Sequence, residues 1–235
     1  MAASTNQNEK MDILLVEDDP TVRTLVKAVL ENEGHLVQIA ETASAGENLA
    51  ISDSFDMIIL DLRLPDGNGY DICINIRENE ITTPVLFLSA EHETDVKIKC
   101  LKVGADDYIT KPFNSEELMA RIEAIARRSN SQGIEEVLNC KELRVDLIGR
   151  KLQVAEKDVA LTNNEFNLLV YLMKNQNRVI SQDELAKKVW GIDFDTQTNY
   201  INVYISYLRK KIRQHAEHEY IETVRKRGFV LRCSN

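Results

Sequence analysis

Five side chains of three chemical kinds each lie close after an apolar run of this 235-residue chain. They are the carboxylic acids Glu17, Asp18 and Asp61, the hydroxyl of Ser89 and the ammonium group of Lys111. Clustered carboxylates repel one another unless a cation neutralises them, and oxygen ligands beside a phosphate suit Mg²⁺. An ammonium and a hydroxyl group can hold the oxygens of a phosphoryl group. In such a site Asp61 is a nucleophile that can become an acyl phosphate.

Short apolar strands that alternate with helices must bring these side chains together. We predict strands at 13–16, 36–40, 57–60, 84–88 and 108–109, and helices near 20–34, 43–52, 68–78, 93–103 and 115–127. This alternation indicates an α/β doubly wound parallel sheet with right-handed crossovers. All five side chains then fall at the carboxyl ends of strands, where ligands collect in such sheets. The simpler interpretation of Asp61 alone is that it caps the turn at residues 65–67.

The distribution of charge indicates two domains with different partners. The net charge of the chain is −9, but residues 1–133 hold 12 basic and 24 acidic side chains, whereas residues 134–235 hold 17 and 14. Residues 198–232 are the most basic part of the second half, with 8 basic and 3 acidic side chains. A polyanion is therefore a candidate partner of the second half.

The sequence also predicts the compartment and the state of the cysteines. No apolar run approaches the roughly 18 residues that a membrane span needs, and residues 1–10 lack the apolar core of a secretory signal. We therefore expect a cytoplasmic protein with no membrane partner and a disordered lead-in at residues 1–10. Cys73, Cys100, Cys140 and Cys233 are widely spaced and have no histidine at ligand spacing. This pattern predicts buried reduced thiols rather than a disulfide framework or a zinc site.

Four motifs in the first half resemble a known family. They are VEDDP at 16–20, DLRLPDG at 61–67, LSA at 88–90 and GADDYITKPF at 104–113. In this order and at this spacing they resemble the receiver domain of bacterial two-component response regulators. The resemblance covers about residues 11–128 and implies a five-stranded parallel sheet with the strand order 2-1-3-4-5.

The resemblance implies a role for each polar residue. Asp61 would take a phosphoryl group from the phosphohistidine of a sensor histidine kinase, and Lys111 and Ser89 would contact the phosphoryl oxygens. Ser89 and Tyr108 would form a switch in which the hydroxyl turns toward the phosphate and the ring follows it inward. The simpler interpretation of Tyr108 is a half-buried aromatic of the sheet. Mg²⁺ would be held by oxygen ligands from Glu17 (through water), Asp18, Asp61 and the backbone carbonyl of Arg63.

In the subfamily that the chain resembles, active receivers form homodimers through the fourth helix, fifth strand and fifth helix. The matching positions of this chain keep opposite charges, and we expect the cross-subunit pairs Lys97 with Glu117, Asp107 with Arg121, and Asp106 with Arg128. Because exposed ion pairs are each worth only about 0.2–1 kcal/mol, these pairs are expected to set the orientation of a homodimer more than its affinity. The alternative is that the charges simply keep a helix face solvated.

The pattern of elements changes after residue 128. Residues 129–134 are predicted to be a linker. Alternating segments at 137–140, 143–146, 151–154 and 157–161 predict a small antiparallel sheet, and capping motifs at Thr162 and Ser181 open two helices. A third helix at 196–214 and a hairpin of 220–224 and 229–232 complete the pattern. Three helices and a hairpin with a basic tip predict an α+β winged-helix domain over residues 135–235.

Motifs within 161–169, 181–191, 203–211 and 223–229 resemble the effector domain of the OmpR/PhoB subfamily, so the resemblance spans nearly the whole chain. The recognition helix departs from the subfamily, because polar and aromatic residues replace several of its common basic, Asp and His residues. We therefore predict that DNA binding relies on the wing and that asparagines read adenine-containing sites. The alternative is weak, nonspecific binding by solvent-facing side chains. The predicted DNA-contacting residues are Asn199, Asn202, Tyr204, Ser206, Tyr207, Arg209, Lys210, Arg213, Thr223, Arg225, Lys226 and Arg227.

Together these observations predict a two-component transcription factor. Phosphorylation of Asp61 by a sensor histidine kinase would control its sequence-specific binding to double-stranded DNA, and RNA polymerase is an expected partner. The only catalysis expected is the receiver's own Mg²⁺-dependent phosphotransfer and dephosphorylation. A phosphatase of the haloacid dehalogenase type would need an acid where the chain has Arg63. A regulator that works unphosphorylated is disfavoured by the intact set of Asp18, Asp61, Ser89 and Lys111.

Overall fold

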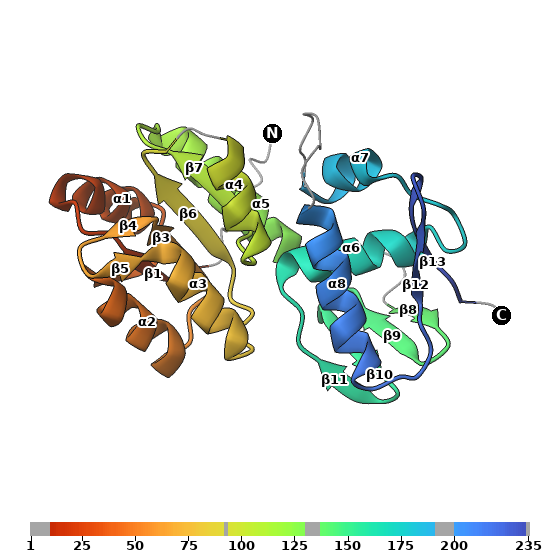
Figure 1. The fold of residues 1–235 in the computed structure, drawn as a ribbon. Helices are drawn as coiled ribbons and strands as arrows, with labels where there is room; N and C mark the ends of the chain where they lie inside the picture. Colours follow the sequence, from red (N-terminus) through yellow and green to blue (C-terminus); the bar gives the residue numbers. More distant parts are fainter. Residues whose placement is uncertain (1–9, 92–93, 130–136, 191–199, 234–235) are drawn as a thin grey trace, which may run out of the picture. The chain divides into compact units, whose positions relative to one another are not determined.

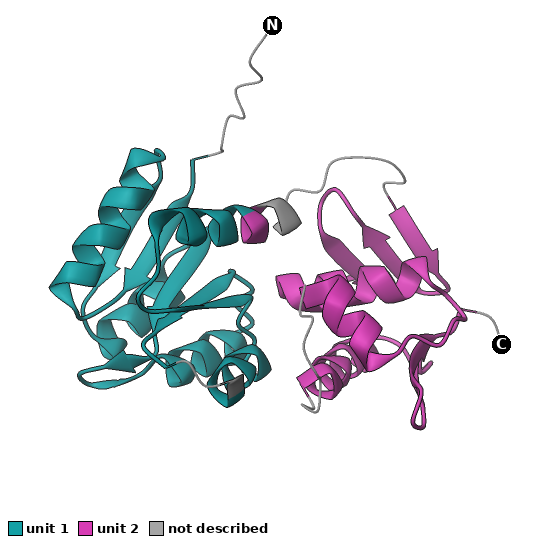
Figure 2. Cartoon of the chain, turned by 90° about the horizontal axis from the view of Figure 1, so that it is seen from above, with its two compact units in different colours: residues 1–123 teal, residues 124–235 magenta. Residues whose placement is uncertain are grey.

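The computed structural model describes residues 10–91, 94–129, 137–190 and 200–233 (Figure 1). The chain divides into two compact units, a first unit of residues 1–123 and a second unit of residues 124–235 (Figure 2). The expected lead-in at 1–10 and linker at 129–134 fall almost entirely outside the described residues. Among the described residues, no helix combines the length and the apolar character that a membrane crossing requires.

The first unit is built on the predicted parallel sheet. Its strands β1 (Asp12–Val16), β2 (Leu36–Ala40), β3 (Met57–Asp61), β6 (Val85–Ser89) and β7 (Asp107–Thr110) lie in the order β2-β1-β3-β6-β7. This confirms the order 2-1-3-4-5, because β4 (Arg63–Leu64) and β5 (Gly67–Asn68) are a two-residue pair in the turn after β3. The chain changes direction across the sheet between β1 and β3. The edge at this switch point is the expected place for a ligand.

Helices cover the sheet because its central strands are apolar on both faces. The helices are α1 (Pro20–Asn32), α2 (Ala43–Ser52), α3 (Gly69–Glu78), α4 (Thr94–Lys102) and α5 (Ser115–Ser129). One apolar cluster joins α2, α3 and α4 to alternate residues of the strands, among them Leu14, Ile58 and Phe87. The residues of β1 and β3 between these are also buried, as is typical of a parallel sheet with both faces covered.

The second unit has the predicted α+β order. Four antiparallel strands, β8 (Val137–Cys140), β9 (Leu143–Asp146), β10 (Lys151–Val154) and β11 (Lys157–Val159), form its first sheet. Three helical segments follow, α6 (Asn163–Lys174), α7 (Gln182–Leu185), which continues as the π-helical turn η1 (Ala186–Trp190), and α8 (Tyr200–Arg213). The hairpin of β12 (Ile221–Val224) and β13 (Gly228–Leu231) ends the unit. Residues 196–199 of the predicted third helix lie outside the described residues.

The two predicted capping motifs form to different extents. At α6 the Thr162 hydroxyl accepts a hydrogen bond from the backbone of Glu165, and the Glu165 carboxylate accepts one from the backbone of Thr162. At α7 only the first half forms, from the backbone N–H of Glu184 to the hydroxyl of Ser181. The Glu184 carboxylate instead binds the hydroxyl of Tyr171 and the guanidinium of Arg178. This ion pair replaces the second half of the capping box.

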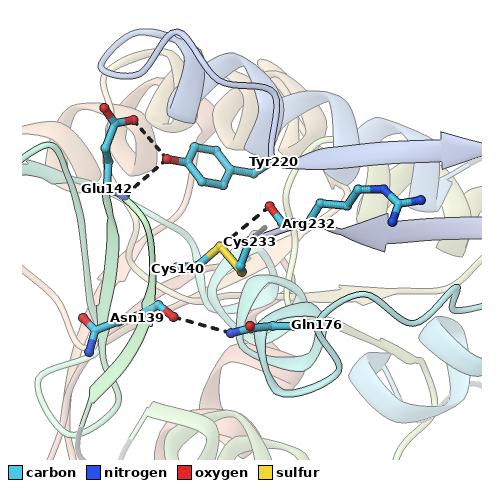
Figure 3. The surroundings of a disulfide bond; sticks show 7 residues. All are labelled: Asn139, Cys140, Glu142, Gln176, Tyr220, Arg232 and Cys233. Carbon is cyan, nitrogen blue, oxygen red and sulfur yellow. Dashed lines mark hydrogen bonds between the residues drawn. A yellow bond between two sulfur atoms is a disulfide. The ribbon is translucent and has the colours of Figure 1, made fainter. Parts of the chain in front are cut away.

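The prediction of four reduced cysteines is wrong for two of them. Cys140 and Cys233 form a disulfide between the end of β8 and the residues after β13 (Figure 3). They are 93 residues apart in the sequence, but their Cα atoms lie 5.1 Å apart, within the usual range for a disulfide. Spacing along the chain does not reveal this proximity, because the hairpin returns to the first sheet of the unit. Cys73 and Cys100 are free and buried, as expected.

Candidate functional site

The three predicted acidic residues meet at the carboxyl edge of the sheet. Val16 of β1 is in register with Leu60 of β3, so the residues that follow them, Glu17 and Asp61, lie side by side. Asp18 joins them, and carboxylate oxygens of the three residues all lie within 4.8 Å of one another. Glu17 is fully buried, Asp61 is nearly so and Asp18 is exposed. The cluster is therefore open to solvent on the side of Asp18.

Lys111 crosses to this cluster from the loop after β7. Its Nζ donates hydrogen bonds to Glu17 Oε2 and to Asp61 Oδ2, each at 2.7 Å. Its backbone N–H donates to the carbonyl of Ser89 at 2.7 Å, which ties the Lys111 backbone to the end of β6. The structure thus brings together four of the five side chains that the sequence singled out, and the backbone of the fifth.

Burial and charge act against each other on these groups. Burial is the largest effect on Glu17, and it raises the pKa of this carboxyl to about 7, although the hydrogen bond from Lys111 opposes the shift. For Lys111, burial lowers the pKa, but hydrogen bonds to Asp61 and Glu17 outweigh it and the net pKa is raised. The ammonium therefore stays charged at neutral pH and neutralises part of the acidic cluster.

The donor set fits a hard divalent cation. Carboxylate oxygens are the ligands that Mg²⁺ takes in proteins, usually with several waters, and the exposed side at Asp18 leaves room for water. The second Asp61 oxygen, Oδ1, accepts a hydrogen bond from the backbone N–H of Arg63 at 3.2 Å. The backbone N–H of Arg63 therefore lies beside the cluster, and the role of its carbonyl as a ligand stays a prediction.

The predicted switch residues meet at Glu91, which the sequence did not single out. The backbone N–H of Glu91 donates to Ser89 Oγ at 3.1 Å, and its carbonyl accepts a hydrogen bond from the hydroxyl of Tyr108. Its carboxylate accepts one from Arg63 Nε at 2.9 Å. Asp61 of β3 and Leu88 of β6 are in register. Arg63 follows Asp61 by two residues and Glu91 follows Leu88 by three, so the two side chains meet beyond the ends of these strands. Their opposite charges at these positions could have predicted the ion pair from the sequence.

Tyr108 lies inward in this structure. Its side chain is buried more completely than the half-buried aromatic of the simpler interpretation, with 5% exposed. Burial raises the pKa of its hydroxyl, and a hydrogen bond with Ser89 opposes this shift. Lys97 places its Nζ 5.6 Å from the centre of the ring.

Some of the charged residues predicted for a homodimer face form ion pairs within the chain, whereas Asp106 is buried. Arg121 is paired within the chain, at 3.0 Å to Asp107 and 3.1 Å to Glu117. The prediction that Asp106 lies on this face is wrong, because its side chain is buried and accepts a hydrogen bond from the backbone N–H of Val85 at 2.9 Å. Its carboxylate also lies 3.6 Å from Arg77. The side chain of Arg128 lies outside the described residues.

One face of α8 carries the residues predicted to contact DNA. Ser206 and Tyr207 are exposed, and Asn202 is partly exposed. The prediction for Tyr204 is wrong, because its ring is buried and packs 5.1 Å from the ring of Trp190. Helical spacing places Tyr204 on the apolar stripe of α8, whose other members are Ile201, Ile205, Leu208 and Ile212. Asn199 lies outside the described residues.

Two of the basic residues of α8 are paired within the second unit, one of them with the hairpin. Arg209 donates hydrogen bonds to the carbonyl of Ile221 at 2.8 Å and to the hydroxyl of Thr223 at 2.9 Å, so these two predicted DNA contacts bind each other. Arg209 and Arg213 also pair with Glu219, at 3.5 and 3.4 Å. Lys210 is exposed. The freely exposed charge on α8 is smaller than its sequence indicates.

The tip of the hairpin is the second predicted DNA contact. Arg225, Lys226 and Arg227 are all exposed there. Lys226 has a backbone φ of 58°, in the left-handed region where glycine is favoured. A glycine at this position would adopt this backbone conformation without strain. The hairpin is held to the unit by a β-bridge between Ile180 and Phe229.

Comparison with known proteins agrees with both units. Residues 13–123 match the response regulator receiver domain, and residues 156–231 match the C-terminal domain of transcriptional regulatory proteins. The response regulator ArlR of Staphylococcus saprophyticus is 40% identical over 220 residues, covering 94% of this chain and 98% of its own. The uncharacterized transcriptional regulatory protein YkoG of Bacillus subtilis is 35% identical over 226 residues, covering 95% and 99%.

A solved structure is also similar over both units. A mutant of RitR has a TM-score of 0.66 and 26% identity, covering 94% of this chain and 98% of its own. The sheet order, the acidic cluster with Lys111 and the two domain matches all agree. The chain therefore belongs to the two-component response regulators of the OmpR/PhoB type, in which a receiver domain precedes a C-terminal transcriptional regulatory domain.

Proposed function

We propose that Asp61 is the phosphoacceptor and that its phosphorylation controls binding of the second unit to DNA. The observation that carries this proposal is the position of Lys111 in the acidic cluster. Its Nζ lies 2.7 Å from Glu17 Oε2 and 2.7 Å from Asp61 Oδ2. An ammonium group beside a carboxylate nucleophile can bind the oxygens of a phosphoryl group that forms on that carboxylate. The exposed side of the cluster at Asp18 leaves it accessible from solvent.

Asp61 supplies the nucleophile of the transfer. One carboxylate oxygen forms the new O–P bond as the P–N bond of the kinase phosphohistidine breaks, and the electron pair of that bond stays on the imidazole nitrogen. Lys111 exchanges its contact with Asp61 for one with a phosphoryl oxygen, and the Ser89 hydroxyl donates to another. Asp18, Asp61 and the backbone carbonyl of Arg63 would hold Mg²⁺, with Glu17 acting through water, and the ion would supply charge neutralisation when bound.

The conformational change that follows phosphorylation involves the loop that contains Glu91. When Ser89 turns toward the phosphoryl group, it gives up the N–H of Glu91, whose carbonyl also holds Tyr108. The intrachain pairs of Arg121 with Asp107 and Glu117 are then free to exchange across a homodimer. Each pair is partly exposed to solvent, so we expect it to be worth about 1 kcal/mol or less and to give orientation more than affinity.

DNA is contacted by α8 and by the hairpin tip. The exposed side chains of Ser206, Tyr207 and Lys210, with partly exposed Asn202, line the recognition helix, and residues 225–227 touch the backbone or minor groove. Because Arg209 is held by the hairpin, the basic tip provides a larger share of the phosphate contacts than the helix. Asn202 is suited to read adenine.

The remaining expectations complete the proposal. The receiver spans 11–128, the linker 129–134 and the winged-helix domain 135–235. The protein is cytoplasmic, its partners are a sensor histidine kinase, double-stranded DNA, RNA polymerase and a second copy of the chain, and the receiver catalyses only its own phosphotransfer and dephosphorylation.

The test is selection of DNA from a random duplex library by the full chain, incubated with Mg²⁺ and acetyl phosphate. We expect enrichment of paired half-sites about one helical turn apart that is lost in Asp61→Asn. Asp71→Asn, an exposed aspartate on α3, is the matched control and keeps the enrichment. Phosphate-affinity electrophoresis reports the modification separately. Enrichment that survives Asp61→Asn would show that phosphorylation does not control binding.

A second experiment tests the role of the hairpin tip. Lys226→Gly removes one charge and also the left-handed strain, so the domain keeps its fold while the salt dependence of DNA affinity decreases by about one unit of slope. Lys157→Gln, an exposed lysine on β11, is the control. If Arg225→Gln and Lys226→Gly both leave the footprint and the affinity unchanged, the hairpin does not contact DNA.

A further inference from the structure

The disulfide lies at the base of the basic hairpin. Cys140 is the last residue of β8, and Cys233 follows β13 by two residues. Beside them, the backbone N–H of Arg232 donates to the carbonyl of Tyr220 at 2.8 Å, which closes the hairpin at the end away from its tip. Cys140 Sγ also lies 3.8 Å from the carbonyl oxygen of Arg232 (Figure 3). The two sulfur atoms therefore join the hairpin base to the first sheet of the second unit.

A hydrogen-bonded contact fastens the same base a short distance away. The hydroxyl of Tyr220 donates to Glu142 Oε2 at 3.0 Å and accepts from the backbone N–H of Glu142 at 3.3 Å. Figure 3 shows Tyr220 and the disulfide on neighbouring sides of the β8–β9 turn. The hydrogen bonds do not depend on the disulfide, so the hairpin stays attached without it but is less constrained.

Only this pair of cysteines is placed for thiol chemistry. Cys73 and Cys100 are fully buried, and burial raises the pKa of their thiols to about 11 and about 12. At neutral pH they hold almost no thiolate, which is the reactive form. Cys140 is nearly buried, whereas Cys233 is partly exposed near the end of the chain. An external thiol would therefore reach the sulfur of Cys233 first.

We propose that Cys140 and Cys233 are a redox-responsive pair whose oxidation fixes the base of the hairpin and strengthens DNA binding. The inference rests on the proposed cytoplasmic location and DNA binding. In that compartment, thiols are ordinarily kept reduced, and the disulfides that do form are usually transient or redox-sensing. The disulfide form described here is then the state reached under oxidative conditions.

The oxidation is a two-electron exchange with a low-molecular-weight disulfide. One protein thiolate attacks that disulfide and releases one thiol, and the other protein thiolate then attacks the mixed disulfide and releases the second thiol. Two protein thiols and one small disulfide thus become one protein disulfide and two small thiols. In the reverse direction, attack on the Cys233 sulfur breaks the S–S bond and leaves the electron pair on Cys140.

Closing the disulfide has two expected consequences. It closes a loop of 93 residues that includes all the helices and the hairpin of the second unit, so the unfolded chain has fewer conformations and the Tm rises by on the order of 10 °C. It also pre-organises the hairpin before DNA arrives, which we expect to tighten DNA binding by roughly threefold to tenfold.

The test uses the full chain in a Cys73→Ser, Cys100→Ser background, so that only the pair is counted. The protein is equilibrated in mixtures of reduced and oxidised glutathione, quenched in acid and labelled with a maleimide that shifts its mobility. The Tm is measured in the same mixtures, and the DNA affinity is measured there by the fluorescence anisotropy of a labelled duplex. A Cys140→Ser, Cys233→Ser variant is the reduced mimic, and chemical reduction of the parent repeats the measurement should that variant not fold.

As the mixtures become more oxidising, we expect the number of labelled thiols in the pair to fall from two to none while the Tm and the DNA affinity rise together. The Tm and the DNA affinity of the reduced mimic should not change with the mixture. Thiols that stay fully labelled in every mixture, or never labelled, overturn the redox proposal. Equal affinity of the two states overturns the coupling to DNA. If neither state binds DNA while labelling and the Tm still change with the mixture, the proposed DNA-binding function has failed. The coupling between the redox state of the pair and DNA affinity is then overturned with it.

Discussion

Lys211 stabilises the second unit from inside, whereas its neighbour Lys210 faces solvent. Lys211 Nζ donates to Glu165 Oε2 at 2.7 Å and to the carbonyl of Ala160 at 2.8 Å. Glu165 is only 3% exposed, and among the described residues its carboxylate accepts one other hydrogen bond, from the backbone N–H of Thr162 at 2.8 Å. Replacing Lys211 by Met keeps the length of the side chain but removes the ammonium, which leaves a buried carboxylate with a single donor.

The expected cost follows from these contacts. Breaking a fully buried ion pair costs about 3–5 kcal/mol, and a single hydrogen bond to a charged group is worth about 1.5–3 kcal/mol. The side chain of Lys211 is 31% exposed, so water can replace part of what the carboxylate loses. We therefore expect Lys211→Met to lower the free energy of unfolding of the second unit by about 2–3 kcal/mol.

The single tryptophan of the chain makes the assay selective. Trp190 is buried in the second unit, so its fluorescence during urea unfolding of the full chain reports on that unit. Lys210→Met is the matched control and is expected to change stability by less than about 0.5 kcal/mol, because Lys210 is exposed. Glu165→Gln combined with Lys211→Met should cost less than the sum of the single changes. Equal transitions for the Lys210 and Lys211 variants would refute the reasoning.

Three further outcomes are expected. Because burial raises the pKa of Glu17 from 4.5 to about 7, the folded state binds its proton more tightly. Without Mg²⁺, the contribution of Glu17 to stability is therefore greatest below pH 4.5 and falls by at most about 1.4 kcal/mol per pH unit up to pH 7; Glu17→Gln should remove this contribution to the pH dependence in urea titrations followed by circular dichroism. Gly228→Ala should lower the stability of the second unit by about 1–3 kcal/mol or more, since φ is 131° and a Cβ would lie 1.9 Å from the carbonyl oxygen of Ile180; unchanged tryptophan-detected unfolding would contradict this. Asp106→Ala should destabilise the first unit by about 1–3 kcal/mol, whereas Asp107→Ala, at a partly exposed ion pair, should cost at most about 1 kcal/mol and instead alter the homodimer in sedimentation; the reverse ranking would contradict the burial of Asp106.

Local patterns in the sequence were sufficient for the architecture and for the acidic cluster. Continuous apolar runs identify the strands of the first unit, because both faces of its sheet are covered, and apolar residues at a period of two or 3.6 identify the strands of the second unit and the helices, because one face of each is buried. The cluster follows from the same patterns, since Glu17, Asp61 and Lys111 each end or follow a strand and parallel strands end at one edge. The capping box at Thr162 was visible for the same reason, because both partners lie within four residues.

Contacts between segments that are distant in the sequence decided the features that the sequence analysis predicted wrongly. Asp106 and Asp107 are adjacent and chemically identical, and only the packing of β7 on β6 determines which carboxylate turns inward to Val85. The spacing of Tyr204 allows it to lie on the apolar stripe, but its burial depends on contacts such as the one with the ring of Trp190. Cys140 and Cys233 meet because the hairpin returns to β8 across 93 residues of chain. Sequence spacing measures distance along the chain, whereas burial, pairing and disulfide formation depend on distance through space, which the tertiary fold alone establishes.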